Sequence, residues 1–162
     1  MRAVYPGTFD PFTNGHLDVV RRARSLFGGL LVAVARGGKK RPAFPLAERA
    51  RVIRESVAGL GGVEVATFDG TLVDFLASRR ARVVVRGLRT FSDFDYEFQM
   101  ALFNRRLEPA VETIFVLASP ELAAINSGLV REVAALGRVV SEMVPPPVAK
   151  LLARRFGRRA RR

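Results

Sequence analysis

Short apolar runs recur along this chain, and polar or glycine-containing segments separate them. The run at 30–35, Leu-Leu-Val-Ala-Val-Ala, contains no polar residue. An uninterrupted apolar run of this length is typical of a β-strand that is covered on both faces, as in a parallel sheet. We therefore predict five β-strands, at residues 3–5, 30–35, 63–68, 83–85 and 113–117.

Between these runs, apolar residues recur every three to four positions, which is the period of one helix face. The first such series follows the first strand and consists of Leu17, Val20, Ala23, Leu26 and Phe27. Similar spacing predicts helices at 46–60, 71–78, 93–106 and 148–156, and a further helix, capped by Asn126 or Ser127, that runs through Leu136. In the 93–106 helix, the predicted buried stripe is Phe94, Phe98, Ala101 and Leu102.

Because strands and helices alternate, the pattern predicts an α/β fold, namely a Rossmann-like, doubly wound, five-stranded parallel sheet. The length of 162 residues suits one domain. We place this domain at 1–157 and expect the basic tail at 158–162 to be disordered. The chain enters its first strand at once and contains no apolar run of the roughly 18–20 residues that span a bilayer, so we expect a cytoplasmic protein without a membrane partner.

The segment between the first strand and the first helix has the features of a phosphate-binding loop. It reads Tyr-Pro-Gly-Thr-Phe-Asp-Pro-Phe-Thr-Asn-Gly-His at 5–16, and its glycines, Gly7 and Gly15, allow a close backbone approach. A helix that begins just after His16 points its free N–H groups and its positive dipole end at the loop, where an anion is stabilised. His16 is the only histidine in the chain, and its place at this helix start favours a functional role.

Other polar groups follow the remaining strands. Lys39, Lys40 and Arg41 come after the second strand, and Arg86 and Arg89 come after the fourth. The helix that starts at Asn126 or Ser127 offers a second anion site, while Glu97 is either a surface residue or a partner of the arginines. The chain has no cysteine, and these strand ends offer neither a covalent nucleophile nor a pair of carboxylates at general acid/base spacing. The set indicates phosphoryl or nucleotidyl transfer by positioning and charge neutralisation.

Several motifs resemble those of a known enzyme family. Gly7-Thr8-Phe9-Asp10-Pro11 followed by Thr13-Asn14-Gly15-His16 resembles the His-x-Gly-His signature of the nucleotidyltransferase superfamily, in the Thr-x-Gly-His form of bacterial phosphopantetheine adenylyltransferases. Arg86-Gly87-Leu88-Arg89, Asp93-Phe94-Asp95-Tyr96-Glu97 and Asn104-Arg105 resemble further blocks of that family. The resemblance implies transfer of AMP from ATP to 4′-phosphopantetheine with Mg²⁺, giving dephospho-coenzyme A and pyrophosphate in the penultimate step of coenzyme A synthesis. It also implies a homohexamer.

The resemblance further implies roles for individual residues. The catalytic set it implies is His16, Lys40, Thr8 and Arg89. Phosphopantetheine would be bound by Thr8, Lys40, Leu72, Arg86 and Asn104. ATP would be bound by Thr8, Phe9, His16, Gly87, Leu88, Arg89, Glu97, Leu122, Ala123, Ala124, Ile125, Asn126, Ser127 and Gly128. No protein group is implied as a metal ligand, because the ATP phosphates would hold most of the Mg²⁺ coordination.

One segment departs from the family pattern. Where the family has Ile-Ser-Ser-Ser, this chain has Ile125-Asn126-Ser127-Gly128, so both outer hydroxyls are absent. Backbone N–H donors at a helix start survive such changes, and Asn126 is a good helix cap. We expect ATP binding to persist with altered contacts.

Two alternatives remain open at this stage. A sister enzyme would act on nicotinamide or nicotinate mononucleotide, glycerol phosphate or choline phosphate, but those relatives usually have His where Thr13 stands. The net charge of +12 suggests a nucleic-acid-binding protein, but seven of the basic residues and no acidic one lie at 150–162. The chain has 2 Tyr, no Trp and 12 Phe, and most of the Phe occupy core-spaced positions, so base-stacking aromatics are scarce and no nucleic-acid partner is expected.

Overall fold

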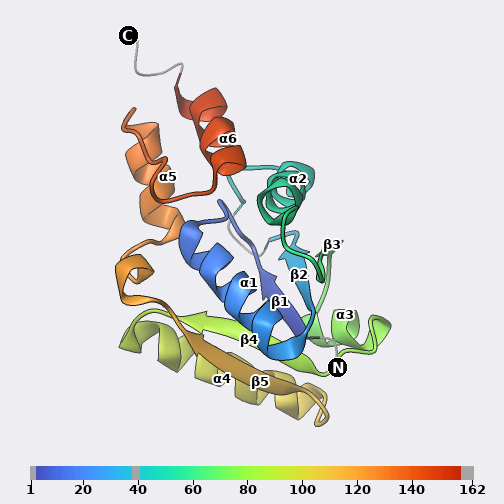
Figure 1. Cartoon of the computed structure of the whole chain (residues 1–162). Helices are drawn as coiled ribbons and strands as arrows, with labels where there is room; N and C mark the ends of the chain where they lie inside the picture. The colour runs from blue at the N-terminus through green and yellow to red at the C-terminus, as the bar shows by residue number, and fades with distance from the viewer. Residues whose placement is uncertain (1–2, 38–40, 158–162) are drawn as a thin grey trace.

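The computed structural model describes residues 3–37 and 41–157 (Figure 1). Five parallel strands form one sheet in the order β3-β2-β1-β4-β5. They are β1 (Ala3–Gly7), β2 (Leu30–Ala35), β3 (Val63–Phe68), β4 (Val83–Leu88) and β5 (Glu112–Leu117). The predicted α/β fold with a five-stranded parallel sheet is confirmed.

Helices cover both faces of the sheet, as a doubly wound fold requires. They are α1 (Asn14–Phe27), α2 (Leu46–Val57), α3 (Leu72–Ser78), α4 (Phe91–Leu107), α5 (Ser127–Ala135) and α6 (Pro146–Phe156), with a short 3₁₀ turn, η1 (Pro120–Leu122), before α5. One core lies between the sheet and α1, α2, α5 and α6, whereas a smaller core packs α3 on the opposite face (Figure 1). Successive side chains of a strand therefore alternate between the two cores: Tyr5 lies in the first and Val4 in the second.

Two element boundaries differ from the prediction in ways that matter for function. Helix α1 begins at Asn14, with Thr13 as its N-cap, so His16 lies within the first turn and not before the helix. The prediction places Thr13 in the loop, but Thr is a strong N-cap, so the helix can start earlier. Strand β4 continues to Leu88, so Arg86 and Gly87 belong to the strand and do not follow it. Pairing with β5 through Leu88 supports this extension.

The predicted buried stripe of α4 is wrong. Phe94, Phe98 and Leu102 are 39%, 45% and 52% exposed, and Phe91 and Phe103 of the same helix are exposed as well. The expectation that most phenylalanines occupy core positions therefore fails on this helix. Helical spacing identifies an apolar face, but it does not tell what covers that face. Leu26, which the spacing assigns to the apolar face of α1, is also exposed, and it lies in the last turn of that helix.

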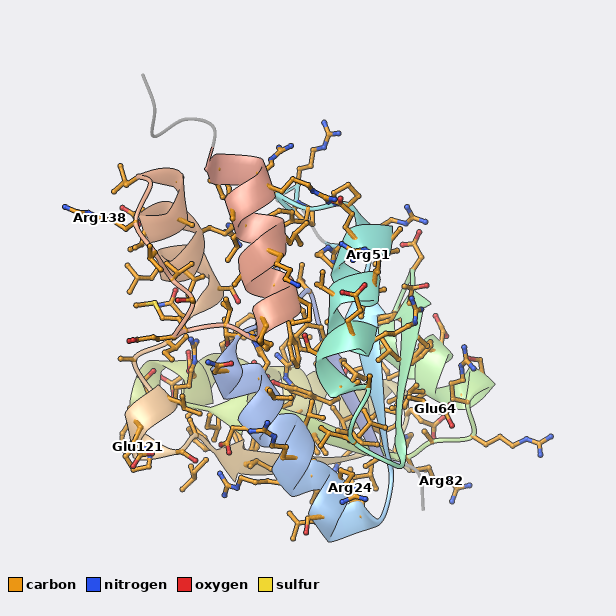
Figure 2. The ribbon with its side chains drawn as sticks, turned by 45° about the horizontal axis from the view of Figure 1, so that its top comes forward. Arg24, Arg51, Glu64, Arg82, Glu121 and Arg138 are labelled. Atoms are coloured by element: carbon orange, nitrogen blue, oxygen red, sulfur yellow. The ribbon has the colours of Figure 1, made fainter. Side chains whose placement is uncertain are left out.

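No helix within residues 3–37 and 41–157 combines the length and apolar character that a bilayer crossing requires. The basic residues of the structure are spread over many elements. In Figure 2, the labelled Arg24, Arg51, Arg82 and Arg138 point outward from different parts of the molecule. The predicted tail at 158–162 lies outside the described residues.

Candidate active site

A cavity of about 670 Å³ lies where the C-terminal ends of β1 and β4 meet the first turns of α1 and α5. Such a crevice is where ligands bind in open α/β sheets. Most of the residues that the family resemblance assigns to ATP line it: Thr8, Phe9, His16, Gly87, Arg89, Glu97, Ala123, Ala124, Ile125, Asn126, Ser127 and Gly128. The fold thus brings together segments that are more than 100 residues apart in sequence.

A smaller cavity of about 210 Å³ adjoins the first on the side of α3 and α4. The described residues that the resemblance assigns to phosphopantetheine line this second cavity: Thr8, Leu72, Arg86 and Asn104. Thr8, Arg86 and Glu97 line both cavities. Two ligands, one in each cavity, would therefore meet at these shared side chains.

Two of the described residues that the resemblance assigns, Leu88 and Leu122, do not line either cavity. Leu88 is buried, with 7% exposure. Leu122 ends the η1 turn, and its carbonyl oxygen lies beside Gly15. Lys40 lies outside the described residues, so its role stays a prediction.

His16 is held in one orientation by the start of its own helix. The backbone N–H of Thr13 donates to His16 Nδ1 over 2.9 Å, and the His16 ring stacks on Phe12. Because Nδ1 accepts this hydrogen bond, the neutral ring carries its proton on Nε2. Burial, followed by the positive charges of Arg89 and Arg86, lowers the pKa of His16 to about 3. In the free protein His16 is therefore a neutral N–H donor on the cavity wall.

Gly7 lets the backbone of the first loop lie close to the ring of Phe9. A Cβ atom at Gly7 would lie 2.8 Å from the ring of Phe9, which is closer than real Cβ contacts allow. Phe9 packs edge-on against Tyr5 and against His16. The absence of a side chain at position 7 therefore leaves room for Phe9 to pack against both Tyr5 and the His16 imidazole.

Both arginines of the Arg-Gly-Leu-Arg segment are paired with carboxylates. Arg86 donates two hydrogen bonds to Glu97, one of them over 2.6 Å, so Glu97 is the partner that the sequence had left as one of two alternatives. Burial by itself lowers the pKa of Arg86, but the hydrogen bonds and charge of Glu97 raise it above the usual value. Arg89 donates to Asp93 over 3.0 and 3.1 Å and to the carbonyl of Ile125. Both guanidinium groups are thus oriented before any ligand arrives.

The segment that departs from the family pattern still builds a regular helix start. Asn126 is the N-cap of α5, and its Oδ1 accepts from the N–H of Leu129 over 2.8 Å. The Ser127 hydroxyl donates to the carbonyl of Pro11 over 2.8 Å, which joins α5 to the first loop. The predicted helix start is confirmed, with Asn126 and not Ser127 as the cap.

Sequence reasoning missed two residues of this region, Arg49 and Asp10. Arg49 of α2 is 1% exposed, and Asp10 of the first loop is 7% exposed. The available signal was a basic residue on an apolar helix face, four positions before Ile53. A charged residue is almost never fully buried without partners.

The described residues contain no group of three or more His, Cys, Asp or Glu side chains that could bind a metal ion. Around the larger cavity, Glu97 and Asp93 are already bonded to arginines. The donor set of the site, which consists of guanidinium groups, a neutral imidazole and helix N-termini, suits anions.

Comparisons with known proteins agree with this geometry. The model of the cytidylyltransferase-like family matches residues 4–133. A phosphopantetheine adenylyltransferase from Alkalilimnicola ehrlichii is 55% identical over 156 residues, which cover 95% of this chain and 90% of that protein. Phosphopantetheine adenylyltransferases from Thioalkalivibrio sulfidiphilus and Moorella thermoacetica are 52% and 45% identical over 155 residues each, covering 96% of this chain and 98% and 97% of those proteins.

A solved structure shows the same fold. The crystal structure of a bifunctional NMN adenylyltransferase/ADP ribose pyrophosphatase from Francisella tularensis matches with a TM-score of 0.73 and 16% identity, over 94% of this chain and 48% of that one. At this identity the likeness concerns the fold alone. The sequence relatives, in contrast, match nearly from end to end. The chain belongs to the phosphopantetheine adenylyltransferase family, within the cytidylyltransferase-like proteins.

Proposed function

We propose that this protein transfers AMP from ATP to 4′-phosphopantetheine, giving dephospho-coenzyme A and pyrophosphate, the penultimate step of coenzyme A synthesis. The observation that carries the proposal is the pair of adjoining cavities whose common wall includes Thr8 and Arg86. ATP in the larger cavity and phosphopantetheine in the smaller one would bring their phosphates together at this wall. The names of the sequence relatives support the same pair of substrates.

The proposed reaction is a direct in-line transfer. A phosphate oxygen of phosphopantetheine attacks the α-phosphorus of ATP, the bond from that phosphorus to the β-phosphate oxygen breaks, and pyrophosphate leaves with the bonding electrons. In this scheme Thr8 orients the attacking phosphate, and the Nε2–H of His16 donates to the phosphoryl oxygens as negative charge builds on them. A preorganised donor of this kind stabilises the transition state without reorganisation cost at the moment of reaction. No covalent intermediate is required.

The arginines would balance the charge of the phosphates. Arg86 would contact the acceptor phosphate from the shared wall, and Arg89 would contact the ATP side near Ile125. Their existing pairs with Glu97 and Asp93 hold each guanidinium in a fixed plane. Lys40 would be a third cation, carried into the site by the segment that follows β2.

We propose Mg²⁺ as the metal of the reaction, entering the site with ATP. Mg²⁺ keeps several waters and commonly binds through substrate phosphates with few protein carboxylates. The site fits this mode, because its side chains are mainly cationic or neutral donors and the anionic oxygens would come from ATP. When bound, Mg²⁺ neutralises phosphate charge.

We propose that the protein forms a homohexamer, as the family resemblance implies. The support in the structure is the number of exposed apolar side chains on α4 and β5, which we together call the α4–β5 face: Phe91, Phe94, Phe98, Leu102, Phe103, Leu107, Ile114 and Leu117, each between 38% and 94% exposed. Many large apolar side chains exposed on neighbouring elements of a soluble protein indicate an interaction site. Sedimentation velocity at micromolar concentration should give the mass of six chains. A monomer would contradict this proposal.

The test of the proposed activity is pyrophosphate release from ATP and Mg²⁺ with 4′-phosphopantetheine, run beside nicotinamide mononucleotide and glycerol 3-phosphate as acceptors. Release with phosphopantetheine alone, with dephospho-coenzyme A among the products, is the expected result. Release with another acceptor would keep the mechanism and overturn the substrate. We propose that the protein acts in the cytoplasm and without a nucleic-acid partner.

A further inference from the structure

Arg49 connects three stretches of backbone from inside the protein. Its Nε donates to the carbonyl of Phe44 over 3.0 Å, its Nη1 donates to the carbonyls of Ala35, over 2.8 Å, and Thr8, and its Nη2 donates to that of Arg36 over 2.7 Å. All four acceptors are main-chain carbonyls, and the side chain is 1% exposed. Burial lowers the pKa of Arg49, whereas the charge of Asp10 raises it.

Asp10 also joins the loop at 8–10 to the backbone at 43–44. Its carboxylate accepts from the N–H of Ala43 over 2.9 Å and from the N–H of Phe44 over 3.1 Å. Arg131 of α5 donates to the carboxylate over 3.1 Å and also to the Asp10 carbonyl. Two buried charges of opposite sign thus fasten the loop at 8–10 to the chain on both sides of the segment at 38–40.

The backbone between these two attachments is strained. Phe9 has a φ of +50°, in the left-handed region that disfavours a residue with a side chain. Such a conformation persists only where the surroundings over-determine it. The bonds to the Thr8 carbonyl and to the Asp10 carboxylate lie directly on either side of Phe9.

We infer that Arg49 and Asp10 form a positioning clamp that fixes the loop at 8–10, and with it Thr8, against the backbone at 35–36 and 43–44. The inference rests on the proposed function, in which Thr8 orients the attacking phosphate. Neither Arg49 nor Asp10 lines the two cavities that share Thr8, so both act through the backbone that they hold.

The chemistry of the clamp requires these residue types. A guanidinium offers five N–H donors in one plane, which suits carbonyls arriving from three segments, whereas the ammonium of lysine has three donors on a single nitrogen. A carboxylate offers acceptors on both oxygens, whereas the amide of asparagine has one acceptor and one donor group. Arg49→Lys and Asp10→Asn therefore keep the approximate size of each side chain and remove part of its bonding.

The first arm of the experiment compares Arg49→Lys with Ile53→Ala. Ile53 is buried on the same helix, so the control removes core packing without removing a hydrogen bond. Misplacement of reacting groups by about 1 Å can cost on the order of 100-fold in rate, so we expect kcat to fall at least about 30-fold in Arg49→Lys while the KM for ATP changes less than about threefold. Ile53→Ala should lower the melting temperature and keep kcat near the wild-type value.

The second arm is Asp10→Asn, with the same kinetics and with amide hydrogen exchange at Ala43 and Phe44. We expect faster exchange at one of these amides together with a lower kcat. If Arg49→Lys does not fold, Asp10→Asn decides by itself. The clamp would be overturned if a folded Asp10→Asn kept full kcat. It would also be overturned if Arg49→Lys and Ile53→Ala lost the same melting temperature and the same kcat. A wild-type protein that makes no dephospho-coenzyme A would instead contradict the proposed function, and the exchange rates would still report on the clamp.

Discussion

The active site and the α4–β5 face differ in whether their side chains have bonding partners within the chain. In the active site, Arg86 donates to the carboxylate of Glu97, and the Thr13 hydroxyl accepts from the backbone N–H of His16. Within residues 3–37 and 41–157, no buried side-chain nitrogen or oxygen lacks a hydrogen-bond partner. On the α4–β5 face, in contrast, large apolar side chains such as Phe103 are exposed to solvent. The groups of the active site are paired within one chain, whereas the α4–β5 face is the surface that the proposed homohexamer would bury.

The comparison teaches that one helix, α4, carries side chains of both regions. Helix α4 contributes Glu97 and Asn104 to the cavities, and Phe94 and Phe103 to the exposed face. Substitutions on α4 can therefore affect one property and spare the other. The predictions below use this separation.

The largest effect is expected at His16. Removal of one preorganised donor to a developing charge costs about 10²–10³ in kcat, so His16→Ala should lose activity on that scale. The fold should remain, because Thr13 still caps α1 through its hydroxyl. The ATP affinity should change far less than kcat, because the α5 contacts are untouched. Steady-state kinetics and circular dichroism would check this, and an unfolded His16→Ala would make the histidine a structural residue.

The next effect concerns the α4–β5 face. Phe103→Glu places a charge on the exposed apolar surface, and loss of a central interface contact typically costs at least about 2 kcal/mol, or about 30-fold in association. The matched control is Leu26→Glu, which changes another exposed apolar residue, on α1. Sedimentation velocity should show smaller assemblies for Phe103→Glu only. Equal assembly of both variants would argue that the α4–β5 face is not an interface.

A smaller effect is expected for the ion pair at the shared wall. Arg86 and Glu97 are 27% and 12% exposed, so Glu97→Gln leaves a partly buried guanidinium without its counter-charge. Breaking a fully buried pair costs about 3–5 kcal/mol, and the partial exposure reduces this to about 1–2 kcal/mol of unfolding free energy. The control is Glu112→Gln, which breaks the exposed pair with Arg105 and should change stability by less than about 0.5 kcal/mol. Urea unfolding would separate the two variants.

Much of the sheet could be predicted because its signal is local. The strands at 30–35 and 63–68 have the predicted bounds, since a strand buried in a parallel sheet is marked by its own side chains. The first loop could also be predicted, because its motif residues are contiguous. The α4 stripe failed for the opposite reason: the partner of an apolar face leaves no trace in the sequence of that face.

The clamp shows a second limit of sequence reasoning. The partners of Arg49 are backbone carbonyls, and every residue has one, so no motif marks them. The Asp10 carboxylate likewise accepts from backbone N–H groups more than 30 residues away. The pairing of Arg86 with Glu97 was within reach, because a carboxylate eleven residues further on was recognised as one possible partner. Side-chain pairs leave a compositional signal, whereas bonds to the main chain do not.

The smallest predicted effect is a pH dependence of stability that comes from His16 alone. The folded protein keeps the imidazole neutral because its pKa is lowered to about 3, whereas the unfolded chain binds a proton near the ordinary value of about 6.5. Acidification therefore favours the unfolded state, and the stability present above pH 6.5 is lost as the pH falls towards 3. Between pH 6.5 and 5.5 the loss is at most about 1 kcal/mol, and solvent at the partly exposed ring reduces it. His16→Asn removes the only histidine of the chain, so the difference in unfolding free energy between wild type and variant isolates this contribution. Unfolding free energies would be measured in urea for both proteins across this window. If they change with pH by the same amount, His16 is not held neutral by the fold.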